Sequence, residues 1–182
     1  MAQAKRKKKF FDVEIPILKK ETQLLAYEVK DLNERLMKYD LTRVLKGKSI
    51  LLQMRIKVDE GKAVAFPEGI NLMPYFLKKM IRKGTNYVED SFSAECKDAK
   101  LKIKSFLITR RKVSRAVRKS LREKAREEII SYTKNKDSMT IFDDILKNHL
   151  QKNLSLILKK IYPLSLCEIR FLRIERKSES KE

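Results

Sequence analysis

Residues 50–58, Ile-Leu-Leu-Gln-Met-Arg-Ile-Lys-Val, carry the clearest structural pattern of the chain. Apolar side chains alternate there with Gln53, Arg55 and Lys57, which is the two-residue period of a strand with one buried face. Residues 59–62 have the composition of a turn and end the run. The stretch predicts a half-buried strand near the middle of a sheet-containing domain.

The same alternation recurs on both sides of this strand. Further strands are expected at residues 11–17, 25–29, 87–96, 99–108 and 166–174. Pro16 indicates an edge strand or the end of a strand. Residues 97–98 suggest a hairpin between two of these strands, and the apolar parity of the last one slips between Phe171 and Leu172, which indicates a bulge.

Amphipathic helices are expected between these strands, at about 73–81, 111–134 and 140–161. Asn71 can cap the first helix, and Pro74 suits its first turn. Thr140 and Asp143 form a weak capping box for the last helix. Its apolar stripe comprises Phe142, Ile145, Leu146, Leu150, Leu154, Ile157, Leu158 and Ile161.

This order of elements favours an α+β fold, with an antiparallel, barrel-like β-sheet of about six strands and flanking amphipathic helices. The chain of 182 residues suits one domain with a core. We expect a disordered basic arm at 1–9, a single domain at 10–175 and a polar tail at 176–182.

Positive charge is concentrated rather than spread. The formal net charge is +20, from 44 basic and 24 acidic side chains. Nine of the seventeen residues from Arg110 to Arg126 are basic, and only Glu123 is acidic. At about 100° per residue, Arg111, Arg115, Arg118, Arg122 and Arg126 fall within one arc of a helix. Such an arginine face suits phosphate groups.

A phosphate-reading surface is therefore expected from the basic arm, the lysine face of the strand at 99–108 and the arginine segment. Its predicted RNA-binding residues are Lys5, Arg6, Lys7, Lys8, Lys9, Lys100, Lys102, Lys104, Arg110, Arg111, Lys112, Arg115, Arg118, Lys119, Arg122 and Arg126. Tyr39, Tyr75, Tyr87 and Phe66 could stack on bases, although packing within the fold is the favoured role for each.

Nothing in the sequence argues for an enzyme, a cofactor or a metal. His149 is the one histidine and is expected to be structural, and Cys96 and Cys167 have no metal-site or disulfide spacing. Asp143 and Asp144 point about 100° apart on a helix, which suits the helix dipole better than paired catalysis. The cysteine content favours a reducing cytosol, and we expect neither a signal peptide nor a membrane span.

Several local strings, taken in order, resemble the archaeal–eukaryotic small-subunit ribosomal protein family S3Ae, called eS1 in the universal nomenclature. They lie at residues 9–13, 39–42, 105–111, 115–119, 161–164 and 168–170. The most specific is the Tyr-Pro-Leu turn at 162–164 before a basic terminal strand. Because the chain lacks the long tails of eukaryotic members, the resemblance implies an archaeal source.

The resemblance implies a β-barrel-like domain with flanking helices, on the platform of the small subunit near the messenger exit. Its implied partners are small-subunit ribosomal RNA, neighbouring ribosomal proteins and messenger RNA near the exit, with no membrane and no homo-oligomer. It implies a cytoplasmic location in the ribosome. The alternatives are a free nucleic-acid-binding protein, chromatin-associated or regulatory, and an anionic-membrane binder. The former lacks helix-turn-helix spacing and a dimerisation heptad, and the latter lacks Trp on its apolar face.

Overall fold

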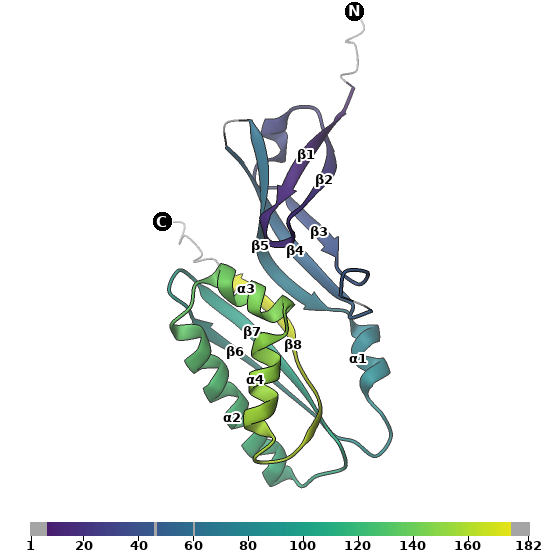
Figure 1. The fold of residues 1–182 in the computed structure, drawn as a ribbon, viewed down its shortest axis with the longest axis vertical. Coiled ribbons are helices and arrows are strands. Elements are labelled where there is room, and N and C mark those ends of the chain that lie inside the picture. The colour runs from purple at the N-terminus through teal and green to yellow at the C-terminus, as the bar shows by residue number, and fades with distance from the viewer. Residues whose placement is uncertain (1–6, 46, 60, 176–182) are drawn as a thin grey trace, which may run out of the picture.

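The computed structural model describes residues 7–45, 47–59 and 61–175. In this part of the chain, an eight-stranded sheet and four α-helices form an α+β fold (Figure 1). The strands are β1 (Lys9–Ile15), β2 (Lys20–Ala26), β3 (Leu36–Asp40), β4 (Ile50–Asp59), β5 (Lys62–Leu72), β6 (Tyr87–Glu95), β7 (Lys100–Thr109) and β8 (Leu164–Glu175). The helices are α1 (Pro74–Met80), α2 (Arg115–Lys134), α3 (Ser138–Leu146) and α4 (His149–Leu158), with 3-10 turns η1 (Pro16–Leu18) and η2 (Val29–Leu32).

Strand β5 is the hub of the sheet. One of its edges pairs with β4, and the other edge is shared between β1, at Ala63 and Val64, and β8, from Gly69 to Asn71. The strand order is β2-β1-β5-β8-β7-β6, and β3 lies beyond β4. A Cβ atom at Gly69 would lie 3.1 Å from the carbonyl oxygen of Leu172, so glycine permits the close approach of β8.

The prediction of a barrel-like antiparallel sheet is wrong in two respects. The sheet is mixed, because β1 runs parallel to β5, and it is open. Both edges of β5 are occupied and the two halves of the sheet diverge from it, so the outer strands β2 and β6 stay apart (Figure 1). The sequence also missed β3 and β5. Pro67 and Gly69 interrupt the pattern of β5, and both residues are unusual inside a strand.

Two strand expectations were accurate in detail. Strands β6 and β7 form the expected hairpin, and β1 ends at Ile15, directly before Pro16. The expected bulge also exists, because β8 places one extra residue, Arg170, between the partners of Lys104 and Ser105 in β7. The strand expected at 25–29 lies earlier in the chain, in β2.

The boundaries of the first two helices differ from the expectation. Helix α1 starts at Pro74, as proline permits, but its N-cap is Met73, because Asn71 belongs to β5. Helix α2 starts at Arg115 with Ser114 as its N-cap, four residues later than expected. Residues before Ser114 follow the end of β7 and lie outside any helix.

The single helix expected at 140–161 is two helices, α3 and α4. Asn148 separates them with a positive φ of 61°, a conformation that asparagine tolerates better than most residues. The N-cap position of α3 is Asp137, so the capping box expected at Thr140 is wrong.

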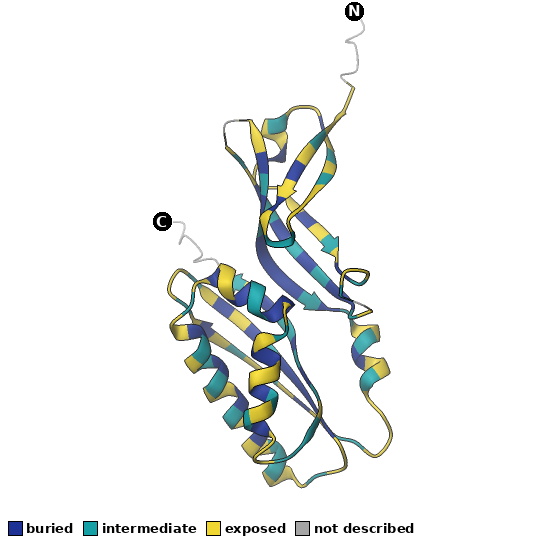
Figure 2. Cartoon of the chain, in the orientation of Figure 1, coloured by how far each residue is buried: buried dark blue, intermediate teal, exposed yellow. Residues whose placement is uncertain are grey.

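The helices cover one face of the half-sheet formed by β6, β7 and β8 (Figure 1), and buried positions recur along their inner sides (Figure 2). The apolar stripe predicted in the last helical segment is core except at its end, where Ile157 is half-buried and Ile161 is 37% exposed. Its buried members are Phe142, Ile145, Leu146, Leu150, Leu154 and Leu158. Each such side chain contributes about 1.5–3 kcal/mol when fully buried.

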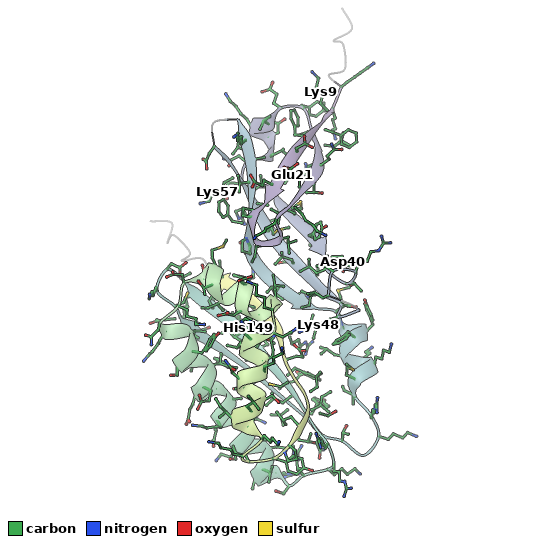
Figure 3. All side chains as sticks on the ribbon, viewed as in Figure 1. Lys9, Glu21, Asp40, Lys48, Lys57 and His149 are labelled. Carbon is green, nitrogen blue, oxygen red and sulfur yellow. The ribbon has the colours of Figure 1, made fainter. Side chains whose placement is uncertain are left out.

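A polar contact joins the β3–β4 loop to the helical half of the molecule. Lys48 donates to Glu168 Oε2 at 2.6 Å and to Asn148 Oδ1 at 2.5 Å, and Figure 3 shows Lys48 close to the start of α4. The side chains of Lys48 and Glu168 are only 13% and 12% exposed. This ion pair fixes the position of the α3–α4 junction against β8.

Candidate nucleic-acid interface

Helix α2 has one packed side and one arginine side, as the sequence predicts. The Ser114 side chain accepts a hydrogen bond from the Val117 backbone N–H and so caps the first turn. Its fully buried positions recur every four residues, at Leu121, Ala125, Ile129 and Thr133. Four of the five predicted arginines lie on this helix, at Arg115, Arg118, Arg122 and Arg126. Arg111, with Arg110 and Lys112, lies in the segment before it, all three exposed.

Two side chains that the sequence did not single out hold this basic segment in place. Asn86, just before β6, accepts a hydrogen bond from Val113 N through its Oδ1 at 2.8 Å. Thr109, fully buried at the end of β7, donates to Asn86 O at 3.0 Å and to Arg111 O at 2.7 Å. These bonds fasten the chain between β7 and α2 to the start of β6. No short-range sequence signal links Asn86 to Val113, because they are 27 residues apart.

A groove of about 690 Å³ lies between α2 and the start of β6. The helix contributes Arg115, Arg118, Lys119 and Arg122. The opposite wall comprises Ile81, Thr85, Asn86, Tyr87, Val88 and Glu89. The groove therefore combines four cations with one carboxylate, and it attracts anions.

The arginines of α2 differ in what they already bind. Arg126 donates two hydrogen bonds to Asp90 of β6, both 2.9 Å long, and its guanidinium lies 5.4 Å from the ring centre of Phe92. Among the described residues, Arg115, Arg118 and Arg122 have no such carboxylate partner. The first half of the helix therefore offers unpaired guanidinium groups, whereas Arg126 is committed to the fold.

Acidic residues also neutralise the second half of α2. Lys124 lies 3.3 Å from Glu127 and 3.1 Å from Glu128, and hydrogen bonds to Glu128 and Glu127 raise the pKa of Lys124. Lys119 lies 3.8 Å from Glu123, a longer contact between two well-exposed side chains. Surface pairs of this kind contribute little to stability, but they reduce the local positive charge. The free positive charge of α2 is concentrated in its first two turns.

The lysines of β7 lie on the opposite side of the sheet from α2. In the β6–β7 pairing, Phe92 and Asp90, which contact α2 through Arg126, share a face with Ile103 and Ser105. Lys100, Lys102 and Lys104 alternate with the buried Leu101 and Ile103 and face the other way, as predicted. Lys100 pairs in register with Glu95 and Glu175, and Lys104 lies 5.3 Å from the ring centre of Phe171. The structure thus does not bring these lysines into the groove of α2.

The basic arm lies far from the arginine helix. Lys5 and Arg6 lie outside the described residues, as does the expected tail at 176–182. Lys9 is the first residue of β1, and Lys8 lies 5.4 Å from the ring centre of Tyr27. Lys9 is at the opposite end of the molecule from α2 (Figures 1 and 3). The predicted contacts therefore form at least three separate surfaces.

The residues considered for chemistry have structural surroundings. Asp144 accepts hydrogen bonds from Tyr132 at 2.7 Å and Lys136 at 2.6 Å, whereas Asp143 pairs with Lys147. Burial alone would raise the pKa of Asp144, but its hydrogen bonds outweigh burial and lower it. His149 is at the surface, 59% exposed, with Nδ1 3.6 Å from Asp144 Oδ1, and not on the apolar stripe.

The cysteines are separate thiols. Burial raises the pKa of the Cys167 thiol to about 12, with a further contribution from Glu168. Cys96 is half-buried and bonds to Ala99 O, and burial raises its pKa too. Across the described ranges, no group of three or more His, Cys, Asp or Glu side chains is arranged to hold a metal ion.

The sequence places this fold in a known family. The family model for ribosomal S3Ae proteins matches residues 2–178. The chain belongs to the ribosomal S3Ae family. A small ribosomal subunit protein eS1 from Pyrobaculum aerophilum is 28% identical over 138 residues, which cover 75% of this chain and 62% of that protein. The eS1 protein of Nanoarchaeum equitans is 28% identical over 120 residues, covering 65% of this chain and 61% of that protein.

These comparisons confirm the resemblance and support an archaeal member of the family. The chain spans about 62% of the length of the curated relatives it matches. Within the residues that the structure describes, no helix is both long enough and apolar enough to cross a membrane.

Proposed function

We propose that this protein is a structural constituent of the small ribosomal subunit in the cytoplasm, where it binds ribosomal RNA. The observation that carries the proposal is the family match over residues 2–178, joined to a helix whose first turns present three unpaired arginines along a groove. Guanidinium groups without internal carboxylate partners are available to phosphate oxygens. Family membership favours ribosomal RNA over other polyanions.

The proposed RNA contacts fall into a primary and a secondary set. Arg115, Arg118, Lys119 and Arg122 form the primary set, because they share one groove and a high local positive charge. Arg110, Arg111 and Lys112 extend it along the fixed segment before α2. The secondary set comprises the basic arm and the lysine face of β7, which would reach RNA on other sides of the protein.

Location within the subunit follows from the family resemblance alone. We place the protein on the platform near the messenger exit, next to other ribosomal proteins and within reach of messenger RNA. It acts there as a single copy and as a binding protein without catalytic activity.

Sucrose-gradient sedimentation of a lysate tests this function. The wild-type protein is expected to travel with small subunits and to remain with them at high salt. A variant with Arg115, Arg118 and Arg122 changed to Gln should shift toward the top of the gradient. The matched control changes three exposed lysines of the distant half-sheet, Lys30, Lys38 and Lys62, to Gln, which removes the same charge. Wild-type protein that sediments alone, or with DNA, would contradict the ribosomal assignment.

A further inference from the structure

The groove between α2 and β6 has two walls of different chemistry. One wall is the row of arginines, and the other includes the aromatic ring of Tyr87, which is 54% exposed. The ring of Tyr87 stacks on Phe106, with ring centres 5.9 Å apart and planes 20° apart. Phe106 is itself buried in the sheet at 1% exposure. Tyr87 is therefore a fixed platform with an exposed side, set beside a phosphate-binding surface.

The arginine wall is also held in advance of binding. Arg118 is only partly exposed, and its Nε has no exposed surface and no hydrogen-bond partner among the described residues. Its side chain is thus packed against the protein, which lowers the conformational entropy lost when its guanidinium binds an anion. Glu89, the carboxylate in the wall, accepts two hydrogen bonds of 3.0 Å from Arg170, so its charge is already compensated.

The dimensions of the row suit a short run of backbone. Seven residues separate Arg115 from Arg122, which is about 10 Å along a helix axis. Phosphates in one strand of a stacked helix recur every 3.4 Å or so along its axis, so about three of them span this distance. A run of a few phosphates can lie along the arginines while one base between them reaches Tyr87.

We propose that this groove holds an unpaired nucleotide of RNA, with its base stacked on Tyr87 and its flanking phosphates on Arg115, Arg118 and Arg122. The inference rests on the proposed RNA binding and specifies the form of RNA that the groove takes. In an A-form duplex the bases are stacked inside and cannot meet an aromatic platform, whereas bulges and loops can turn a base outward. A fixed aromatic ring beside arginines therefore favours a single-stranded segment, without selecting a particular base.

The absence of tryptophan from the sequence gives a direct test. Tyr87→Trp introduces a single indole at the platform, and Tyr75→Trp introduces one on α1 outside the groove, where the native tyrosine is similarly exposed at 56%. Each variant is titrated with a ten-nucleotide oligouridylate, with a ten-base-pair RNA hairpin duplex closed by a short loop at one end, and with inorganic polyphosphate. Binding is followed by anisotropy of a labelled oligonucleotide or by competition, and stacking by quenching of the tryptophan emission.

The oligouridylate should quench the indole at position 87 by at least twofold and the indole at position 75 by much less. Polyphosphate should compete for binding without quenching, because it has no base to stack. Tyr87→Leu should weaken oligouridylate binding about tenfold, while Tyr87→Phe should retain it, since stacking on an aromatic ring contributes about 1–3 kcal/mol per base. Thermal melting confirms that the variants are folded.

The outcomes separate this inference from the proposed function. RNA that binds tightly but quenches positions 87 and 75 equally would overturn the unpaired-nucleotide site and leave RNA binding intact. A hairpin duplex without unpaired loop bases that quenches position 87 as strongly as the single strand would overturn the site in the same way. If none of the RNA probes binds the folded wild-type protein, both the inference and the proposed RNA binding fail.

Discussion

Arg126 offers a sharp test, because the sequence groups it with the RNA-binding arginines and the structure gives it an internal partner. Its two hydrogen bonds to Asp90 are 2.9 Å long, and Asp90 is only 10% exposed while Arg126 is 47% exposed. Arg126→Gln should therefore destabilise the fold and leave RNA binding almost unchanged. Arg115→Gln and Arg122→Gln should have the opposite effects.

The expected magnitudes follow from the burial of the pair. Leaving a mostly buried carboxylate without its charged partner costs about 1–3 kcal/mol, and the exposure of Arg126 places the expected cost at about 1–2 kcal/mol. For a domain of this size, that lowers the melting temperature by roughly 2–8 °C. Removing the Arg126 guanidinium from the ring of Phe92 adds to the same effect.

The assay measures melting temperature and RNA affinity from 50 to 300 mM salt for each single variant. Each phosphate that the protein no longer neutralises should flatten the log–log salt slope by about 0.7–0.9. Arg115→Gln and Arg122→Gln should each flatten the slope by this amount at an unchanged melting temperature, and Arg126→Gln should do the reverse. Asp90→Asn serves as the partner control, because it should reproduce the thermal shift and add little in the double variant. An Arg126→Gln protein with a wild-type melting temperature and a flattened slope would refute the division between the two halves of α2.

Three further outcomes follow from the core and from the acidic network. Leu154→Ala should lower the free energy of unfolding by about 2–5 kcal/mol in urea titrations, because Leu154 is 3% exposed and a cavity would remain; a decrease below about 1 kcal/mol would place this residue outside the core. His149→Gln should change RNA affinity by less than about twofold, since the side chain is exposed and outside the groove, and weaker binding at an unchanged melting temperature would require a functional role. Because the pKa of Asp144 is lower in the fold than its ordinary unfolded value of about 3.9, its stabilising effect is complete above that value and disappears as the pH falls through the folded pKa. Wild-type protein should therefore lose more stability than Asp144→Asn between about pH 5 and pH 2 in acid titrations followed by circular dichroism, and parallel curves would contradict this role.

Periodicity in the sequence was sufficient for features that depend on near neighbours. The alternation in residues 50–58 predicted β4, the turn residues at 97–98 predicted the β6–β7 hairpin, and the slip in parity near Phe171 predicted the bulge of β8. The arginine arc and the apolar side of α2 were predicted for the same reason. A regular element repeats its faces every two or 3.6 residues, so the sequence alone shows which side chains share a face.

Elements whose local signal is weak needed the tertiary structure. Strand β5 includes Pro67 and Gly69, and it forms because β1, β4 and β8 all pair with it. The break between α3 and α4 depends on the positive φ of Asn148, which the contact with Lys48 helps to hold. In both places, long-range pairing overrides a local preference that favoured a turn or a continuous helix.

The sequence by itself determined that this protein is strongly basic, that its arginines form one face of a helix and that it belongs to an archaeal ribosomal family. The tertiary structure decided which of those arginines remain available. Asp90 and Arg126 are 36 residues apart, and only the packing of α2 on β6 brings them together. The same packing separates the lysines of β7 from the groove and places Tyr87 within it. A periodic pattern defines the faces of one element, but a binding site depends on which faces of different elements meet.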